Sequence, residues 1–414
     1  MPRRSPLALL LLVHCAGNPV EVSAGSGDDT SSSATSGTGT PAPTTGPTTG
    51  AAPDTSGGAS VGLSTGPDDT TTAPDLTATA ADTSTGEPAS TGGETTAATT
   101  DETTGSTTDG TTGDPVALTM QHVQVKGTHN SYHVQPLIPF DKTHEYSHEP
   151  LDQQLESQGV RAFELDVHQG LGGFEVYHIS VIDSSSTCDG FDECLDVIKG
   201  WSDAHPQHLP VTVWIEIKDG TGGQPIDLGD LAKMDDVIRG VFGPDQLLTP
   251  DDVQAAHPSL REAVMTDGWP ALDSVRGQVL FVLLNVNDDH SLEYTDNYTS
   301  LKGRAMFARA EPAQFAQPWA AVAKLGFGDA ADIAAAHAAN MLIATNVCNA
   351  GDDDDACFAN LETAKAAGIH MLKDDFPGPV DDKPYWMDLP DGDPARCNPV
   401  TAPPGCTSAL LEDL

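Results

Sequence analysis

The chain has 414 residues and a formal net charge of −42 at pH 7. Such an excess of acidic groups argues against nucleic acid as a partner and against electrostatic adsorption to anionic membranes, because both surfaces repel acidic proteins. The composition is uneven: residues 24–114 contain no Lys or Arg and almost no aliphatic or aromatic side chains, so this segment cannot form a hydrophobic core.

The N-terminus has the pattern of an export signal. Arg3 and Arg4 precede the apolar run Leu7–Val13, which is too short to span a bilayer permanently. We therefore predict a signal peptide over residues 1–23 and an exported protein.

Cys15 follows the apolar run directly, as in bacterial lipoprotein signals, in which the cysteine becomes the lipidated first residue. His14 stands where such signals usually carry Gly, Ala or Ser. Ordinary cleavage after "VSA" at Ala24 is therefore the alternative. The first route predicts a lipoprotein of the cell surface or outer membrane, and the second predicts a secreted protein.

Residues 24–115 are rich in Thr, Ser, Gly and Pro. Such a segment buries too little apolar surface to offset the entropy of ordering its backbone. We predict a long disordered tether here, followed by one folded domain over residues 116–414.

Short apolar runs rich in β-branched residues alternate with amphipathic stretches through the folded domain. We expect strands at His122–Gly127, Ala162–Val167, Phe174–His178, Val211–Lys218, Gln278–Leu284, Arg304–Ala308, Met341–Thr345 and His370–Lys373. We expect helices at Glu149–Gln158, Cys194–His205, Leu228–Phe242, Pro312–Leu325 and Phe358–Ala367. This alternation predicts an α/β fold, a (βα)8 TIM-type barrel that is irregular where Phe174 closely follows the second strand. Functional residues in such a barrel collect at the C-terminal ends of the strands.

The six cysteines of the predicted domain fall into three close pairs: Cys188 and Cys194, Cys348 and Cys357, and Cys397 and Cys406. Three short-loop disulfides in an oxidising compartment explain this spacing and agree with export. Zinc binding is the competing interpretation. It is disfavoured because the pairs lack C-x-x-C spacing and regularly spaced histidine partners.

Oxygen-bearing side chains occur at several predicted strand ends. Asn130 follows the first strand, Glu164 and Asp166 share one face of the second, and Glu216 lies on the fourth. Acidic residues inside strands are costly to bury unless they are paired or bind a cation. A set of three carboxylates and one amide oxygen suits a hard divalent ion, Ca²⁺ rather than Zn²⁺.

Two histidines accompany this set, His129 after the first strand and His178 after the third. Beside a bound cation, such a pair suggests phosphodiester chemistry, in which one imidazole takes a proton and the other gives one. Each histidine alone would more often be a structural residue. We expect His133, His144 and His148 to lie in loops without a defined role.

The segments "GTHNSY", "ELDV", "VYH" and "WIEIKD", in this order, resemble the X-type catalytic barrel of phosphatidylinositol-specific phospholipases C, and most closely its calcium-dependent bacterial branch. The resemblance implies that His129 is the general base on the inositol 2-hydroxyl and His178 the general acid toward the diacylglycerol oxygen. It implies diacylglycerol and a cyclic inositol phosphate as products, with slower ring opening to the monophosphate. It also implies Ca²⁺ ligation by Asn130, Glu164, Asp166 and Glu216.

Further site residues follow less directly. Lys218 shares a face with Glu216 and is either a contact to the substrate phosphate or inositol, or the partner of Asp166 or Asp219 in a salt bridge. Asp375, near the end of the last strand, is a candidate to orient His129, although Asp374 could serve instead.

The nearest alternative function is a glycerophosphodiester phosphodiesterase or another metal-dependent phosphodiesterase on the same barrel. Those enzymes usually carry His-Arg-Gly, whereas this chain has His129-Asn130-Ser131. A non-enzymatic surface module is the third possibility. We expect a phospholipid or other phosphodiester as partner, with membrane contact through a lipid anchor or the barrel rim. Nothing in the sequence predicts an oligomeric state.

Overall fold

The computed structural model describes residues 117–219, 224–381, 383–389 and 394–412. The predicted signal peptide, Cys15 and the predicted tether lie outside the described residues. The described residues all belong to the unit Thr112–Leu414. None of the helices in these ranges is both long and apolar enough to cross a bilayer.

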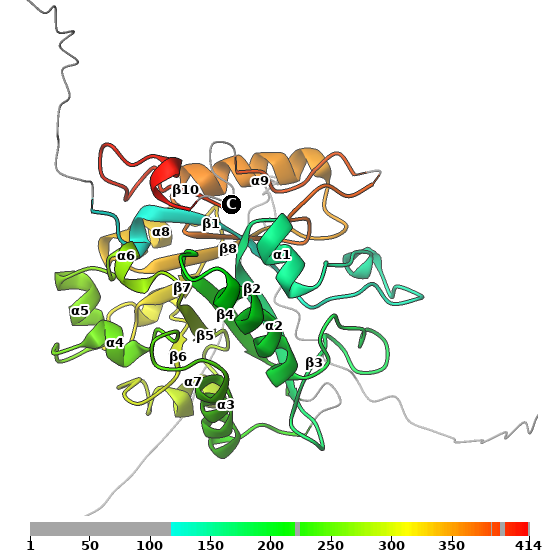
Figure 1. Cartoon of the computed structure of the whole chain (residues 1–414), viewed down its shortest axis with the longest axis horizontal. Coiled ribbons are helices and arrows are strands. Elements are labelled where there is room, and N and C mark those ends of the chain that lie inside the picture. The colour runs from blue at the N-terminus through cyan, green and yellow to red at the C-terminus, as the bar shows by residue number, and fades with distance from the viewer. Residues whose placement is uncertain (1–116, 220–223, 382, 390–393, 413–414) are drawn as a thin grey trace, which may run out of the picture. The chain divides into compact units, whose positions relative to one another are not determined.

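Eight parallel strands form the centre of this unit (Figure 1). Their order in the sheet is β6-β5-β4-β2-β1-β9-β8-β7. Arg309, directly after β6, forms a parallel bridge with Val322 of β7, so the two ends of the sheet meet and nearly close a barrel. The strands are β1 (Val123–Thr128), β2 (Val160–Gln169), β4 (Val211–Ile217), β5 (Val279–Leu283), β6 (Met306–Ala308), β7 (Val322–Lys324), β8 (Leu342–Cys348) and β9 (Met371–Asp374). The predicted barrel is confirmed.

Two strands pair antiparallel with the barrel. β3 (Phe174–Val176) forms a hairpin with the end of β2, and β10 (Ala395–Cys397) pairs with the start of β1. The prediction that Phe174–His178 is a barrel strand is therefore wrong. The reason is the short connection after β2, because a parallel crossover needs a dozen or more residues.

The prediction of a helix over Pro312–Leu325 is also wrong. Only the 3-10 turn η3 (Pro312–Gln314) is helical, and the segment ends in the barrel strand β7. Residues Trp319 to Ala323 are all buried. A short run that is apolar on every side cannot be assigned to helix or strand by periodicity, and its high alanine content favoured the wrong choice.

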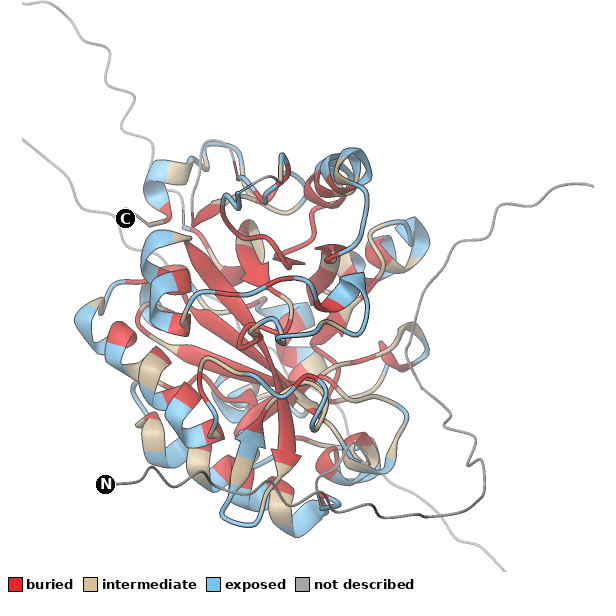
Figure 2. Ribbon diagram, turned by 90° about the vertical axis from the view of Figure 1, so that its right-hand side faces the viewer, coloured by how far each residue is buried: buried red, intermediate tan, exposed pale blue. Residues whose placement is uncertain are grey.

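Helices cover the outside of the barrel, and Figure 2 shows their exposed faces in pale blue around the buried red strands. Four of the five predicted helices are present within a few residues, as α1, α2, α3 and α9. The described helices are α1 (Leu151–Ser157), α2 (Phe191–Ala204), α3 (Leu228–Val241), α4 (Pro250–Gln254), α5 (Leu260–Thr266), α6 (Leu272–Val275), α7 (Asp289–Tyr294), α8 (Ala330–Ala338) and α9 (Asp354–Ala366), with 3-10 turns η1 (Met120–His122), η2 (Lys142–His144) and η4 (Ser408–Leu410). The unpredicted ones, α4 to α8, have nine residues or fewer.

The strands are rich in apolar residues because both of their faces are covered. Every residue of β5, "VLFVL", is buried, as are Phe163, Trp214 and Phe307 on neighbouring strands. Burial of each large side chain contributes about 1.5–3 kcal/mol before entropy is counted. This core fixes the strand ends that carry the polar residues of the site.

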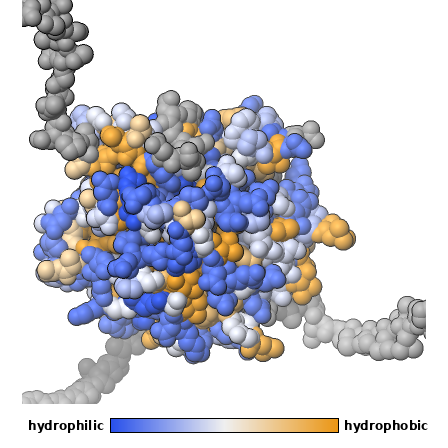
Figure 3. Space-filling view, viewed as in Figure 1, coloured by the Kyte–Doolittle hydropathy of each residue, from blue (hydrophilic) through white to orange (hydrophobic). Residues whose placement is uncertain are grey.

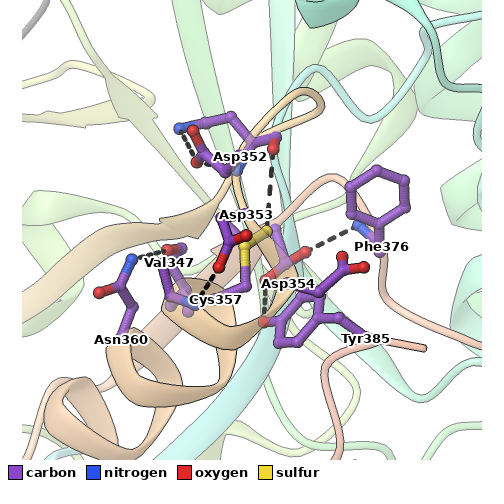
Figure 4. Close-up of a disulfide and its surroundings, with 12 residues drawn as sticks. Val347, Asp352, Asp353, Asp354, Cys357, Asn360, Phe376 and Tyr385 are labelled. Carbon is purple, nitrogen blue, oxygen red and sulfur yellow. Dashed lines mark hydrogen bonds between the residues drawn. A yellow bond between two sulfur atoms is a disulfide. The ribbon is translucent and has the colours of Figure 1, made fainter. Parts of the chain in front are cut away.

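Three disulfides join the predicted pairs: Cys188–Cys194, Cys348–Cys357 and Cys397–Cys406. The second ties the end of β8 to α9 (Figure 4). The acidic residues between these two cysteines serve the helix, since the Asp353 side chain accepts a hydrogen bond from the Ala356 amide at 3.1 Å and caps α9. Acidic groups at this end also complement the helix dipole.

Candidate active site

The loop after β1 is held in one conformation by buried hydrogen bonds. The Thr128 hydroxyl donates to the Gln154 side-chain oxygen at 2.9 Å, and the Ser131 amide donates to the Glu164 carbonyl at 2.9 Å. Asn130 lies in the left-handed region, with φ 43°. Gly127 lets β1 approach β2 closely, because a Cβ there would lie 2.9 Å from the Cβ of Ala162. The loop therefore presents His129 and Asn130 from a rigid base.

The side chain of His129 is bound to a buried carboxylate. Its Nδ1 lies 2.9 Å from Oδ1 of Asp375, whose other oxygen accepts a hydrogen bond from the Ala350 amide at 2.6 Å. Asp374, the alternative partner, instead accepts from the Tyr385 hydroxyl at 2.5 Å. Burial disfavours a charged imidazole, but Asp375 and then Glu164 outweigh it and raise the pKa of His129 above its ordinary value.

His178 has the same arrangement, but it lies on the loop after the hairpin strand β3 rather than on a barrel strand. Its Nδ1 is 2.7 Å from Oδ2 of Asp183, which is fully buried. His133 and His144 bind the same carboxylate, at 2.9 Å and 2.6 Å. Burial alone would raise the pKa of Asp183, but the hydrogen bonds from the histidines hold it well below its ordinary value.

Three of the four predicted calcium ligands lie together. Side-chain oxygens of Glu164, Asp166 and Glu216 all lie within 4.8 Å of one another, because β2 and β4 are neighbours and Asp166 pairs with Glu216 in register. Asp166 is fully buried, and the Lys218 ammonium lies 3.2 Å from one of its carboxylate oxygens. Asn130 is buried at the adjoining end of β1. This oxygen-only set, with three carboxylates close together, fits a hard cation such as Ca²⁺.

Burial also sets the protonation of Asp166. It raises the pKa of this carboxyl to about 6, with Lys218 opposing the shift and Glu216 adding to it. The Lys218 ammonium lies 3.2 Å from Asp166 and 2.8 Å from Glu216. The salt bridge from Lys218 to Asp166, one of the two interpretations of this lysine, is thus present; its contact to substrate stays a prediction.

Two further lysines were not predicted as site residues. Lys373 of β9 is fully buried and forms an ion pair with Glu164, and Lys324 lies 3.6 Å from the same carboxylate. Burial lowers the pKa of Lys373 to about 7, although Glu164 acts in the opposite direction. Neither lysine had a clear sequence signal, because Lys373 ends a predicted strand and Lys324 lies in a segment that was predicted as a helix.

The histidines expected in loops without a role are in fact buried. His148 bonds the His129 carbonyl at 2.9 Å through Nε2, which braces the loop after β1, while His133 and His144 support Asp183. Nothing in the sequence predicted a role for Asp183, since it lies in an irregular loop and contacts these histidines only in the folded structure.

The site has two carboxylate-bound histidines beside a cluster of carboxylates, at the C-terminal end of an α/β barrel. This combination is typical of metal-dependent phosphodiesterases. The chain belongs to the family "Phosphoinositide phospholipase C, Ca2+-dependent", whose family model matches residues 118–173 and 170–399. No curated protein matched the chain.

Solved structures with a similar fold include a Ca²⁺-dependent phosphatidylinositol-specific phospholipase C from Streptomyces antibioticus. It is 21% identical with a TM-score of 0.50, and the match covers 63% of this chain and 96% of that one. A calcium-dependent phosphoinositol-specific phospholipase C from Pseudomonas sp. is 19% identical with a TM-score of 0.48, covering 69% and 97%. At these identities the first match supports the barrel fold.

Proposed function

We propose that this protein is an exported Ca²⁺-dependent enzyme that cleaves phosphatidylinositol to diacylglycerol and inositol 1,2-cyclic phosphate, followed by slower hydrolysis to inositol 1-phosphate. The observation that carries the proposal is the pairing of His129 with Asp375 and of His178 with Asp183, beside the carboxylate cluster. Each imidazole is bound through Nδ1, so each keeps Nε2 for a reacting group.

His129 acts as the general base. Asp375 fixes the proton on Nδ1 and leaves the lone pair of Nε2 to take the proton of the inositol 2-hydroxyl. As that oxygen bonds to phosphorus, the bond from phosphorus to the glycerol oxygen breaks. The Asp375 carboxylate then stabilises the imidazolium that His129 has become.

His178 acts as the general acid and gives its Nε2 proton to the departing diacylglycerol oxygen. Ring opening of the cyclic phosphate reverses the two roles, so that His178 takes a proton from water and His129 returns one to the 2-hydroxyl. Asp183 holds the ring of His178 through both steps.

Glu164, Asp166 and Glu216, with Asn130, would hold the Ca²⁺. When bound, the ion lowers the pKa of the attacking hydroxyl and offsets phosphate charge. Lys218 reaches the same carboxylates and supports the substrate phosphate from the side of β4. Because three carboxylates lie close together here, we expect Ca²⁺ to bind before the anionic substrate.

Contact with the membrane comes from apolar loops near His178. Leu137, Ile138 and Phe140 are 99%, 82% and 74% exposed in the loop after β1, and Val181 is 90% exposed in the loop that carries Asp183. The two loops are neighbours, since the Val134 amide donates to the Ser185 carbonyl. Figure 3 shows hydrophobic side chains protruding at the right-hand edge, the side on which α1 and β3 lie in Figure 1. Insertion of such side chains suits an acidic protein, because it does not depend on attraction to lipid charge.

A turnover assay tests the activity. The purified protein is offered phosphatidylinositol, glycerophosphoinositol and glycerophosphocholine, each with Ca²⁺ or with EGTA. We expect inositol 1,2-cyclic phosphate from phosphatidylinositol only with Ca²⁺, and loss of product in His129→Ala and His178→Ala. His257→Ala, which alters a surface histidine paired with Asp267, is the matched control. Release of glycerophosphate without a cyclic product would contradict the proposal in favour of a glycerophosphodiesterase.

A vesicle assay tests the membrane surface. Serine at Leu137, Ile138 and Phe140 should reduce sedimentation with phosphatidylcholine vesicles containing phosphatidylinositol, and the binding of the unaltered protein should change little with salt. Val400→Ser is the control, because Val400 is 53% exposed but contacts Gly368, before β9, at the opposite end of the barrel. Equal binding by the triple variant would refute the assignment of this surface.

A further inference from the structure

A second group of side chains of the kinds that bind metals lies around Asp183. His144 Nδ1 is 2.6 Å from Oδ2 of Asp183, and His133 Nε2 is 2.9 Å from Oδ1 and 3.1 Å from Oδ2. One ligand atom from each of these three residues lies within 4.8 Å of the others. His178 Nδ1 lies 2.7 Å from the same Oδ2, at the edge of the group.

The group is built into the fold rather than assembled from mobile surface residues. Asp183, His133 and His144 are 0%, 1% and 6% exposed. The ring of His133 stacks on Tyr146 with centroids 4.3 Å apart, and the Thr187 amide donates to the Tyr132 carbonyl at 2.8 Å. Two loops far apart in the sequence are thus fixed against each other, with their nitrogen and oxygen ligands pointing at one place.

The chemistry of the group differs from that of the carboxylate cluster. Two imidazoles and one carboxylate suit Zn²⁺ or a similar transition metal, whereas Ca²⁺ prefers oxygen ligands alone. Zinc binds nitrogen and carboxylate oxygen at about 2.0–2.2 Å. Neighbouring ligands of a tetrahedral ion are therefore about 3.3 Å apart, so the distances of 2.9 Å from His133 and 2.6 Å from His144 to Asp183 would lengthen by about 0.4 Å and 0.7 Å.

Protons that now bridge the group must leave or move when a metal enters. His133 and His144 each direct a ring nitrogen at Asp183, and each must present a lone pair there instead. His133 has a place for its proton, since its buried Nδ1 has no hydrogen-bond partner. The exchange needs no oxidant or reductant.

We propose that His133, His144 and Asp183 form a second metal site, selective for Zn²⁺-class ions and distinct from the calcium site. Because Asp183 also holds His178, an ion bound here takes away the carboxylate on which that imidazole depends. This second statement rests on the proposed function: Zn²⁺ would then slow lipid cleavage even when Ca²⁺ is saturating.

Metal binding is tested without reference to activity. Tag-free protein in metal-stripped buffer with excess Ca²⁺ is titrated with Zn²⁺ by calorimetry and with Co²⁺ by visible absorption. We expect one ion per chain and a tetrahedral Co²⁺ spectrum, with affinity at least about tenfold weaker in His133→Ala and in His144→Ala. His144→Asn serves if the alanine variants fold poorly, as judged by circular dichroism. His257→Ala should bind as the unaltered protein does.

Absence of zinc binding in excess Ca²⁺, or equal binding by the His144 variants, would overturn the site and leave the group as a hydrogen-bonded support for His178. The effect of Zn²⁺ on activity is measured in a separate experiment. Zn²⁺ should lower turnover of phosphatidylinositol in the unaltered protein and in His257→Ala. If the protein turns over no lipid, the proposed function fails while the binding result still decides the metal site.

Discussion

Replacement of Asp166 by asparagine should stabilise the calcium-free protein while abolishing calcium binding. Asp166 is fully buried, and a second carboxylate, Glu216, lies beside it. Asparagine has the same shape without the charge. In the variant, Ca²⁺ would lose one of its ligands. Without Ca²⁺, the variant would lose the repulsion between the negative charges of Asp166 and Glu216.

The pKa of Asp166 gives the magnitude. It rises from an ordinary value of 3.8 to about 6, a difference of about two units, and each unit corresponds to about 1.4 kcal/mol. Because the folded-state pKa is the higher one, the cost of about 3 kcal/mol is present above pH 6 and disappears below pH 4, where the carboxyl is protonated in both states. Lys218 keeps Glu216 as a partner at 2.8 Å, so we expect a gain of about 1–3 kcal/mol at pH 8.

Urea unfolding at pH 8 in EGTA, with the disulfides intact, measures this gain. The unaltered protein should be stabilised by added Ca²⁺ and Asp166→Asn should not. Glu216→Gln is the matched control: its side chain is 32% exposed, so it should lose the calcium effect without the gain in EGTA. If Asp166→Asn were less stable than the unaltered protein in EGTA at pH 8, the account of this carboxylate would be wrong.

Three further outcomes are expected. His129→Ala should lower turnover of phosphatidylinositol by about 10²–10⁴-fold with calcium binding by calorimetry unchanged, and near-normal turnover would contradict its role as base. Asp375→Asn should shift the acidic limb of the rate–pH profile to lower pH, because Asp375 raises the pKa of His129 and the base must be neutral; an unmoved limb would count against that pairing. Gly127→Ala should destabilise the fold by about 1–3 kcal/mol in urea, because the new Cβ would lie 2.9 Å from that of Ala162, and unchanged stability would show that β1 can move.

The barrel and the carboxylate cluster could be predicted because their signals are local. In β2, Glu164 and Asp166 alternate with apolar residues, so ten residues of sequence show both the burial of the strand and its shared acidic face. His129 and Asp375 were also within reach, since the first and last strands of a closed barrel must be neighbours.

The support for His178 could not be predicted in this way. Asp183 lies in an irregular loop, and His133 and His144 lie 50 and 39 residues earlier in the chain, so only the tertiary fold brings them together. The strand β7 was misassigned for a related reason: a three-residue strand carries too little pattern to compete with the composition of its neighbours. β3 was predicted as a strand, but its antiparallel pairing with β2 was not.

The two histidines proposed as base and acid lie on parts of the molecule that we expect to open at different free energies. His129 directly follows a central strand hydrogen-bonded on both sides, so it should be displaced only when the whole domain unfolds. His178 lies on a loop fastened by its contacts to Asp183 and by the nearby Cys188–Cys194 bridge. Sub-global opening can therefore remove the proton donor while the proton acceptor stays in place. On mild heating, such an enzyme can lose activity well below the temperature at which the domain unfolds. The sequence of its loops can also change without disturbing the barrel.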